Sequence, residues 1–225
     1  STRFVRATEA GQRYFDDARR IIGDVDAADE ALIGINAAPR GHLAVTAPVL
    51  FGKMFVLPAI VEYLQRYPEM EVSALFLDRV VNLLEEGLDV GVRIGDLPDS
   101  SMKAMRVGTV RRVLCASPMY LKKHGIPDNP AALAAHTLIT ASGGSPTREW
   151  KFRQGSKSLT VRVKARLTVS SNDAAIDAAL QGFGITRLLS YQIARYLVSG
   201  KLKIILNEFE PLPMPIHVLH REGRY

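Results

Sequence analysis

An apolar stripe with heptad spacing runs through the first forty residues of the chain. Its members recur at alternating steps of three and four: Gly11, Tyr14, Ala18, Ile21, Val25, Ala28, Leu32 and Ile35. This spacing places them along one side of an α-helix, where they can pack against a second helix. The intervening positions are charged or small, and Thr8 precedes the stripe as a candidate N-cap. We therefore predict a long dimerisation helix whose contacts come from the stripe residues Tyr14, Ala18, Ile21, Val25, Ala28, Leu32 and Ile35.

The pattern changes after the Pro-Arg-Gly sequence at residues 39–41, and strand-like and helix-like stretches then alternate. Strands are predicted at 42–47, 70–77 and 89–94. Helices are predicted at 50–67, with a kink or restart at Pro58, and at 80–87, with a glycine stop. This order favours a parallel sheet with helices on both faces.

The second half of the chain repeats this alternation without repeating the sequence. Strands are predicted at 111–116, 137–141, 158–169 and 185–188, and the tail is strand-like at 202–209 and 214–220. Short helices are predicted to begin at Ser117, Asn129, Ser171 and Ser190, where a polar residue or proline favours a helix start. Two similar α/β lobes account for this count of elements.

The composition is that of a globular protein, with 47% hydrophobic and 23% charged residues among 225. No apolar run approaches the roughly 20 residues that a membrane-spanning helix needs, and the first twenty residues lack the apolar core of a signal peptide. The single cysteine, Cys115, excludes an internal disulfide framework. We expect a cytoplasmic protein with no membrane partner.

The net charge of +6 lies in the globular part of the chain. Residues 1–40 contain six Lys and Arg against seven Asp and Glu, whereas the remainder contains 23 against 16. The basic residues are spread out, while a DNA-reading surface concentrates them on one element. This distribution favours an anionic small molecule over nucleic acid as the partner of these residues.

The sequence predicts no catalytic residue, no metal site and no cofactor. The histidines His42, His124, His136, His217 and His220 are scattered, without the spacing of a metal site. Cys115 lies in an apolar predicted strand without an adjacent base, which indicates a buried structural thiol. No glycine loop has the spacing of a phosphate-binding motif. We therefore do not expect an enzyme.

Polar side chains follow several predicted strands, at the sheet edge where open α/β sheets bind ligands. Thr46, Asp78 and Arg93 follow or end strands of the first lobe, and Thr140, Ser142 and residues 171–173 do so in the second. Helix starts and an arginine that converge on one cleft favour an anionic group such as a carboxylate. The alternative, that Thr46, Asp78 and Asn172 serve only as helix caps, is equally compatible with the pattern.

Five segments, taken in order, resemble the LysR-type transcriptional regulators over essentially the whole chain. They are TRFVRATEAGQRYFDDARRIIGDVDAADEAL at 2–32, GHLAVTAPVLFGKMFVLPAIVEYLQRYP at 41–68, DRVVNLLEEGLDVGVRIGDLPDSS at 78–101, VLCASPMYLKKHGIP at 113–127 and SNDAAIDAALQGFGI at 171–185. The first resembles the end of that family's DNA-binding wing and its linker helix. The others resemble its effector-binding domain. The family's winged helix-turn-helix is largely absent from the sequence.

The resemblance implies an α/β fold of two Rossmann-like subdomains, of the type II periplasmic-binding-protein kind, after the long dimerisation helix. Residues 1–40 would be the end of the wing and the linker helix. Subdomain I would comprise 41–113 plus 208–225, and subdomain II would comprise 114–207. The family implies a homodimer, or a tetramer of such dimers, that binds DNA through its N-terminal domain.

The same resemblance places a small-molecule effector in the cleft between the subdomains. By position, the effector-binding residues would be Ala47, Pro48, Val49, Asp78, Arg93, Thr140, Ser171 and Asn172. Many relatives carry a hydroxyl residue near position 48, where this chain has proline, so Arg93 becomes the expected partner of an anionic effector. The resemblance therefore predicts the effector-binding and oligomerisation portion of a transcription regulator. A solute-binding protein with the same two-lobed cleft is the alternative.

Overall fold

The computed structural model contains two compact units, Ser1–Arg40 and Gly41–Tyr225. It describes residues 38–79, 81–83, 85–97, 102–141 and 149–220 in full. In the first unit it also describes Thr8, Ala10, Gly11, Tyr14, Phe15, Ala18, Ile21, Ile22 and Val25.

The described residues of the first unit support the predicted helix and its cap. All of them after Thr8 are helical up to Val25, and the Gly11 N–H donates to Thr8 Oγ1 at 3.1 Å. Tyr14, Ile21 and Val25 are 77%, 58% and 55% exposed. These three side chains of the apolar stripe are therefore exposed to solvent in a single chain. The predicted contacts Ala28, Leu32 and Ile35 lie outside the described residues.

The first sheet of the second unit has the strand order β2-β1-β3-β12-β4. Its strands are β1 (Gly41–Ala47), β2 (Met70–Phe76), β3 (Val90–Ile94), β4 (Lys103–Val110) and β12 (Met214–His220). As predicted, β1 runs parallel to both β2 and β3. The C-terminal strand β12 inserts between β3 and β4 and is antiparallel to both. Strand β4 was not predicted, because its exposed residues give no alternating pattern.

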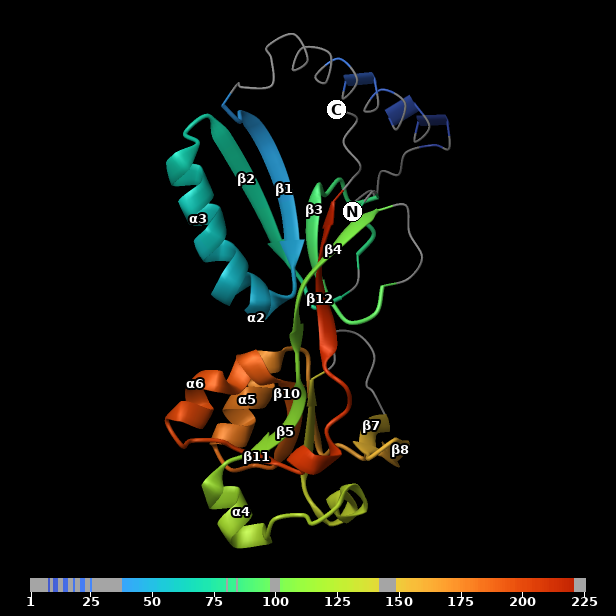
Figure 1. Cartoon of the computed structure of the whole chain (residues 1–225), viewed down its shortest axis with the longest axis vertical. Helices are drawn as coiled ribbons and strands as arrows, with labels where there is room; N and C mark the ends of the chain where they lie inside the picture. The colour runs from blue at the N-terminus through green and yellow to red at the C-terminus, as the bar shows by residue number, and fades with distance from the viewer. Residues whose placement is uncertain are drawn as a thin grey trace, which may run out of the picture. The chain divides into compact units, whose positions relative to one another are not determined.

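A continuous helical segment covers one face of this sheet (Figure 1). It comprises α2 (Val49–Phe51), the π-helical η1 (Gly52–Val56) and α3 (Leu57–Arg66). Pro58 lies in the first turn of α3 and has no N–H to donate to the preceding turn. The Leu57 N–H instead donates to the Gly52 carbonyl, five residues back. The prediction of a kink or restart at Pro58 is confirmed.

The predicted helix at 80–87 is wrong for the residues that the structure describes there. These residues form turns, with one helical bond from the Glu86 N–H to the Asn82 carbonyl. Gly87 ends the turn at φ 66, and the Leu88 N–H bonds to the Leu83 carbonyl. The second face of the sheet is thus covered by a turn that contributes Val81, Leu83 and Leu88 to a core cluster. The stretch is too short to propagate a helix beyond one turn.

The second sheet has the order β11-β5-β10-β6-β9. Its strands are β5 (Arg112–Ala116), β6 (Leu138–Ala141), β9 (Leu167–Val169), β10 (Ile185–Leu189) and β11 (Lys203–Ile205). The associated helices are α4 (Pro118–His124), the 3₁₀ helices η2 (Pro130–Ala135) and η3 (Asn207–Phe209), α5 (Asn172–Leu180) and α6 (Ser190–Val198).

The predicted helix starts in this lobe are confirmed, two of them by side-chain caps. Ser117 Oγ accepts from the Tyr120 N–H at 3.3 Å, and Asn129 Oδ1 accepts from the Ala132 N–H at 3.1 Å. One face of the sheet packs on α5 and α6 through Val113 and Cys115. The other face packs on a cluster that contains Leu114 and Trp150.

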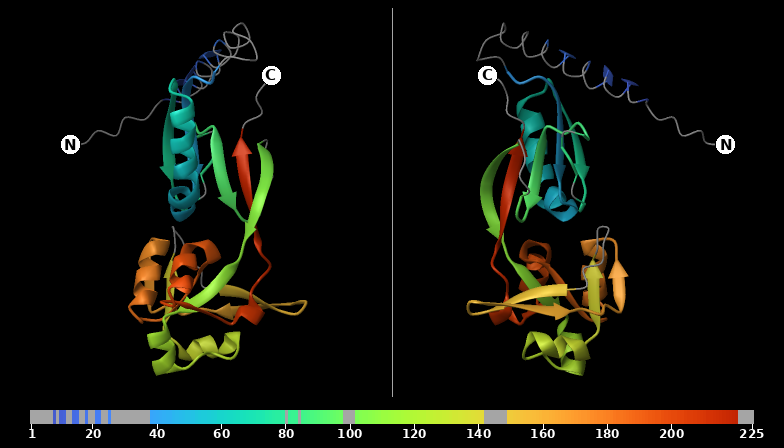
Figure 2. Two further views of the ribbon diagram at one scale, coloured as in Figure 1. Left: turned by 60° about the vertical axis from the view of Figure 1, so that its left-hand side comes forward. Right: turned by 90° about the vertical axis from the view of Figure 1, so that its right-hand side faces the viewer.

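The strand predicted over 158–169 is divided in the structure, because residues 163–166 are not strand and residues 167–169 form β9 of the second sheet. Residues 157–162 form β8 (Lys157–Arg162), which pairs with the unpredicted β7 (Glu149–Gln154) in a hairpin separate from the second sheet. Gly155, at φ 58, makes the turn. Trp150 and Phe152 of β7 are 2% exposed and anchor the hairpin in the core. The hairpin is the yellow ribbon that extends sideways in Figure 2.

Two segments connect the sheets. The outgoing one joins β4 to β5 through Arg111, and the returning one follows η3 and leads into β12. Arg111 donates from Nε and Nη2 to the two carboxylate oxygens of Glu210 at 2.8 and 2.9 Å. This ion pair holds the two connections together.

A glycine in the second lobe provides a stability test. A Cβ added at Gly184 would lie 2.4 Å from the Thr137 carbonyl oxygen, which belongs to the backbone and cannot rotate away. We expect Gly184→Ala to lower the free energy of unfolding by about 1–3 kcal/mol, measured by urea denaturation. In the control Gly108→Ala, the added Cβ meets only Ile216 Cδ1 at 3.9 Å. Equal stability of the two variants would contradict this packing.

Candidate functional site

A cavity of 280 Å³ lies between the two lobes, lined by residues from both. The first lobe and the returning strand contribute Pro48, Asp78, Ile94 and Met214. The second lobe contributes Arg112, Ala141, Asn172, Arg187, Leu188, Leu189, Tyr191 and Gln192. The lining combines apolar side chains with a few groups that can form hydrogen bonds, as ligand sites do.

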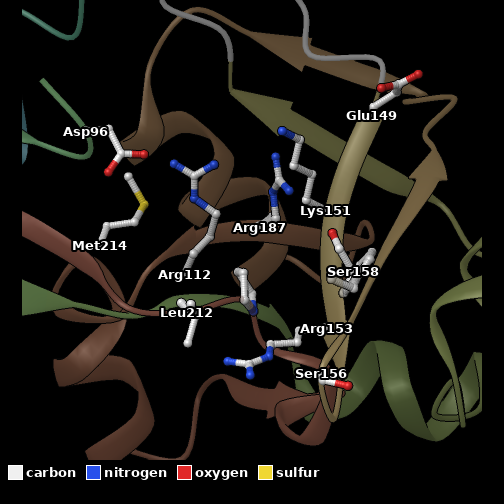
Figure 3. A pocket seen from close by; sticks show the side chains of 12 residues that line it. Asp96, Arg112, Glu149, Lys151, Arg153, Ser156, Ser158, Arg187, Leu212 and Met214 are labelled. Atoms are coloured by element: carbon white, nitrogen blue, oxygen red, sulfur yellow. The ribbon is translucent and has the colours of Figure 1, made fainter. Parts of the chain in front are cut away.

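Two arginines enter this cavity from neighbouring strands. Arg112 of β5 lies directly opposite Leu189 of β10, and Arg187 is two residues before Leu189 on the same face. The two side chains are therefore diagonal neighbours on one face of the sheet. Figure 3 shows their guanidinium groups close to each other. Both side chains are half-buried.

These two guanidinium groups lack a compensating carboxylate among the described residues. Burial and the neighbouring Arg112 charge lower the pKa of Arg187 to about 9. Burial also lowers the pKa of Arg112. Arg187 stacks on the Trp150 ring, 5.1 Å from its centroid. Because two like charges share a partly desolvated site, an anion placed between them would relieve an electrostatic cost.

Asp78 connects the two lobes across the other side of the cavity. Its Oδ1 accepts from the Val49 N–H at 3.1 Å, and its Oδ2 accepts from Asn172 Nδ2 at 3.1 Å. Burial raises the pKa of Tyr191 to about 12, an effect that the Gln192 hydrogen bond partly offsets and the Asp78 charge reinforces. The start of the first helical segment is thus already occupied by a carboxylate of the protein itself.

The structure brings together part of the predicted effector set. Pro48, Asp78 and Asn172 line the cavity, and Val49 contributes its N–H to Asp78. Three predicted effector-binding residues are not among the lining residues. Ala47 is fully buried in the core of the first lobe, and Ser171 directly precedes α5. The hydroxyl of Thr140 forms a hydrogen bond with the hydroxyl of Thr168 at 3.1 Å. Their contact with an effector stays a prediction.

Arg93, the predicted anion partner, lies elsewhere. Its guanidinium donates to the carbonyls of Val92 at 3.0 Å and Val81 at 3.4 Å. Burial lowers its pKa, and the Glu86 charge partly offsets this effect. Arg93 lines neither this cavity nor the larger one described below. The geometry favours Arg112 and Arg187 in its place.

Sequence reasoning missed both of these arginines, although a signal was available. Arg112 stands beside the apolar run 113–116, and Arg187 interrupts the apolar run 185–189. A charge within an otherwise buried strand requires a partner or a ligand. Which face each arginine occupies depends on the pairing of β5 with β10, and the sequence pattern does not specify that pairing.

A second cavity of 650 Å³ adjoins the first at Arg112, Arg187 and Met214, which line both. Its other lining residues come mainly from the β7–β8 hairpin and the returning connection: Asp96, Glu149, Lys151, Phe152, Arg153, Ser156, Ser158, Pro211 and Leu212. Figure 3 shows this cavity.

The described residues contain no group of three or more metal-ligating side chains. Cys115 is fully buried, and burial raises the pKa of its thiol to about 12. The thiol is therefore protonated at neutral pH and is not available as a nucleophile. Among the described helices, none has both the length and the apolar character needed to span a membrane.

The uncompensated charge of Arg187 predicts a pH-dependent stability. We expect Arg187→Met to raise the free energy of unfolding of the ligand-free protein at pH 7. Above about pH 9 folded Arg187 loses its proton while the unfolded chain keeps it, so the gain should shrink as pH rises further. Urea denaturation from pH 7 to 10 measures the difference between variants. Arg195→Met, an exposed arginine that also contacts a ring, is the control, and a gain independent of pH would contradict the assignment.

The comparisons with known proteins agree with this geometry. The LysR substrate binding domain family model matches residues 36–225. The HTH-type transcriptional activator TtdR of Escherichia coli K12 is 30% identical over 227 residues, covering all of this chain and 73% of that protein. An uncharacterized HTH-type transcriptional regulator of Haemophilus influenzae is 28% identical and covers all of this chain and 78% of that protein.

Among solved structures, CrgA, a LysR-type transcriptional regulator from Neisseria meningitidis, superposes with a TM-score of 0.73 at 26% identity. The match covers 99% of this chain and 76% of that one. The fold is thus the two-lobed, type II periplasmic-binding-protein-like fold of these regulatory domains. The family match over most of the chain shows that this protein belongs to the LysR-type transcription regulators and contains their effector-binding regulatory domain.

Proposed function

We propose that this regulatory domain senses a small anionic metabolite in the cavity between its lobes. The observation that carries the proposal is the pair Arg112 and Arg187, which converge on that cavity without a carboxylate partner among the described residues. Guanidinium groups in a partly dry site bind carboxylate or phosphate oxygens through charge-assisted hydrogen bonds. The acid group of the effector binds at this pair.

The opposite side of the cavity favours a different part of the ligand. Asp78 already accepts the Val49 N–H and an Asn172 N–H, so a second carboxylate beside it would be repelled. A ligand hydroxyl or amino group can instead donate to Asp78. The polar ends of the cavity therefore orient an effector with its acid group toward Arg112 and Arg187.

Binding is coupled to regulation through the two lobes. An effector that contacts β5 and β10 together with Asp78 touches residues of both sheets. It favours the lobe arrangement in which these contacts form together, and the populations of the arrangements shift accordingly. In the dimer this shift changes how the regulatory domains pack and thereby the spacing of the DNA-binding helix-turn-helix domains.

The partners follow from the same proposal. The protein acts in the cytoplasm as a homodimer, or a tetramer of two dimers, and binds DNA through a helix-turn-helix of the kind named in its relatives. The exposed stripe residues Tyr14, Ile21 and Val25 supply the dimer contact. A solute-binding protein uses a similar cleft, but the relatives are transcription regulators, so this alternative is not favoured.

The effector proposal predicts a loss of affinity when the anion site is altered. A thermal-shift screen of small acids, aromatic compounds, sugars and amino acids identifies a ligand, because a ligand stabilises the folded state in proportion to its occupancy. For an acid found in this way, we expect Arg112→Met to raise the Kd about 10- to 100-fold by removing a charged hydrogen bond. Isothermal titration calorimetry measures the change.

Two further variants make this test specific. Arg106→Met removes an exposed cation of β4 that lines neither cavity and should leave the Kd unchanged. Arg93→Ala removes the arginine that the sequence favoured. A loss of affinity in Arg93→Ala with none in Arg112→Met would overturn the proposed site.

The dimer proposal predicts that Val25→Asp weakens self-association, because it buries an unpaired charge in the helix contact. Sedimentation equilibrium measures the dissociation constant. Ile22→Asp is the matched control, since Ile22 is, like Val25, an exposed β-branched residue of the helix, at 62% exposure, but stands outside the stripe. An equal effect of both substitutions would argue against a contact centred on the stripe.

A further inference from the structure

The larger cavity of 650 Å³ contains a second cluster of positive charge on the β7–β8 hairpin. Successive residues of a strand point to opposite sides. Trp150 and Phe152 are anchored in the core, so Lys151 and Arg153 lie on the opposite side, where they line the cavity. The core packing of the hairpin thereby fixes the direction of both cations.

The two cation clusters are continuous. Arg112 and Arg187 line both cavities, and Figure 3 shows Lys151 extending beside Arg187. The larger cavity thus has four cations on its wall, against the two carboxylates Asp96 and Glu149. Within the described part of the chain, no ion pair joins these cations to the carboxylates.

The remaining lining suits an organic ligand. The hydroxyls of Ser156 and Ser158 add hydrogen-bonding groups, and Pro211, Leu212 and Met214 add apolar surface. A volume of 650 Å³ lies within the range of about 300–1,000 Å³ that is typical of small-molecule sites. A single carboxylate at the arginine pair would leave Lys151 and Arg153 uncompensated.

We propose that the ligand of this protein is a multivalent anion, a small acid with at least two negative charges. One acid group binds Arg112 and Arg187, and the remaining charge binds Lys151 and Arg153 across the larger cavity. This inference rests on the anionic effector proposed above and extends it to a site on the hairpin. It commits to a ligand whose acid groups are far enough apart to reach both pairs of cations.

The test uses the full chain in a constant chloride background, to which acetate, phosphate or citrate is added at low millimolar concentration. We expect citrate to raise the melting temperature more than acetate does. Screening by salt is then the same throughout, and the general stabilisation by excluded anions is small at such concentrations. A preference for citrate indicates separated acid groups, whereas a preference for phosphate over citrate would contradict them. Equal shifts in acetate and in the two multivalent anions would overturn the proposal.

Variants assign the effect to the hairpin. Lys151→Met should raise the Kd of the preferred multivalent anion about tenfold and leave the effect of acetate unchanged. Lys157→Met is the matched control, because Lys157 pairs with Gln154 on the opposite face of the same hairpin. Lys151 is the better test position, since Arg153 also donates to the Gly155 carbonyl in the turn.

The outcomes separate this inference from the effector proposal. If Arg112→Met abolishes anion binding while Lys151→Met binds like the unaltered protein, the effector proposal stands and the multivalent ligand is wrong. If neither variant changes anion binding, both are wrong. If both weaken binding of the multivalent anion and Lys157→Met does not, both are supported.

Discussion

The ion pair between Arg111 and Glu210 fixes the point at which the two lobes are joined. Arg111 separates β4 from β5, and Glu210 follows η3 on the way back to β12. The contact is bidentate, and the Glu210 side chain is only 14% exposed. The Arg111 side chain is 52% exposed, so the directionality of this pair comes from its bidentate geometry. Because this ion pair joins the two connections beside the cavity, the inter-lobe cavity depends on their alignment.

The candidate site uses two strands that meet at this junction, β5 beginning there and β10 ending there. Arg112 follows Arg111 directly, and β10, which carries Arg187, ends where the Ser190 N–H donates to the Arg111 carbonyl at 2.9 Å. The uncompensated cations are therefore held on rigid, paired strands. Partial burial of Arg112 and Arg187 without a carboxylate partner lowers the stability of the fold. Because the strands hold their N–H donors in a fixed arrangement, the entropy cost of ligand binding stays low.

The sequence was a good guide wherever local chemistry decides the structure. Ser117 and Asn129 start helices in the structure, as their side chains predict, and the parallel order of β1, β2 and β3 follows from the alternation of strands and helices. The strand predicted over 158–169 is divided because β8 pairs with β7 in the hairpin, whereas β9 pairs with β6 in the second sheet.

The site was only partly predictable for the same reason. Asp78 and Asn172 follow strands, where ligand contacts are expected, and both line the cavity. Arg93 also stands near a strand end, but β12 pairs beside it and its side chain donates to backbone carbonyls. The antiparallel pairing of β5 with β10, two segments distant in the chain, determines the face of the sheet from which Arg112 and Arg187 project. Such non-local register leaves no local signature.

The hydrogen bond from Asn172 to Asp78 affects how ligand binding is converted into a change in regulation. This hydrogen bond links the two lobes, so an effector that binds between them exchanges one set of inter-lobe contacts for another. The regulatory signal is then the difference between the two sets, whereas affinity reflects the total strength of the ligand's contacts. A compound that fills the cavity and preserves the hydrogen bond from Asn172 to Asp78 would bind tightly and yet leave transcription unchanged, acting as an antagonist of the natural effector.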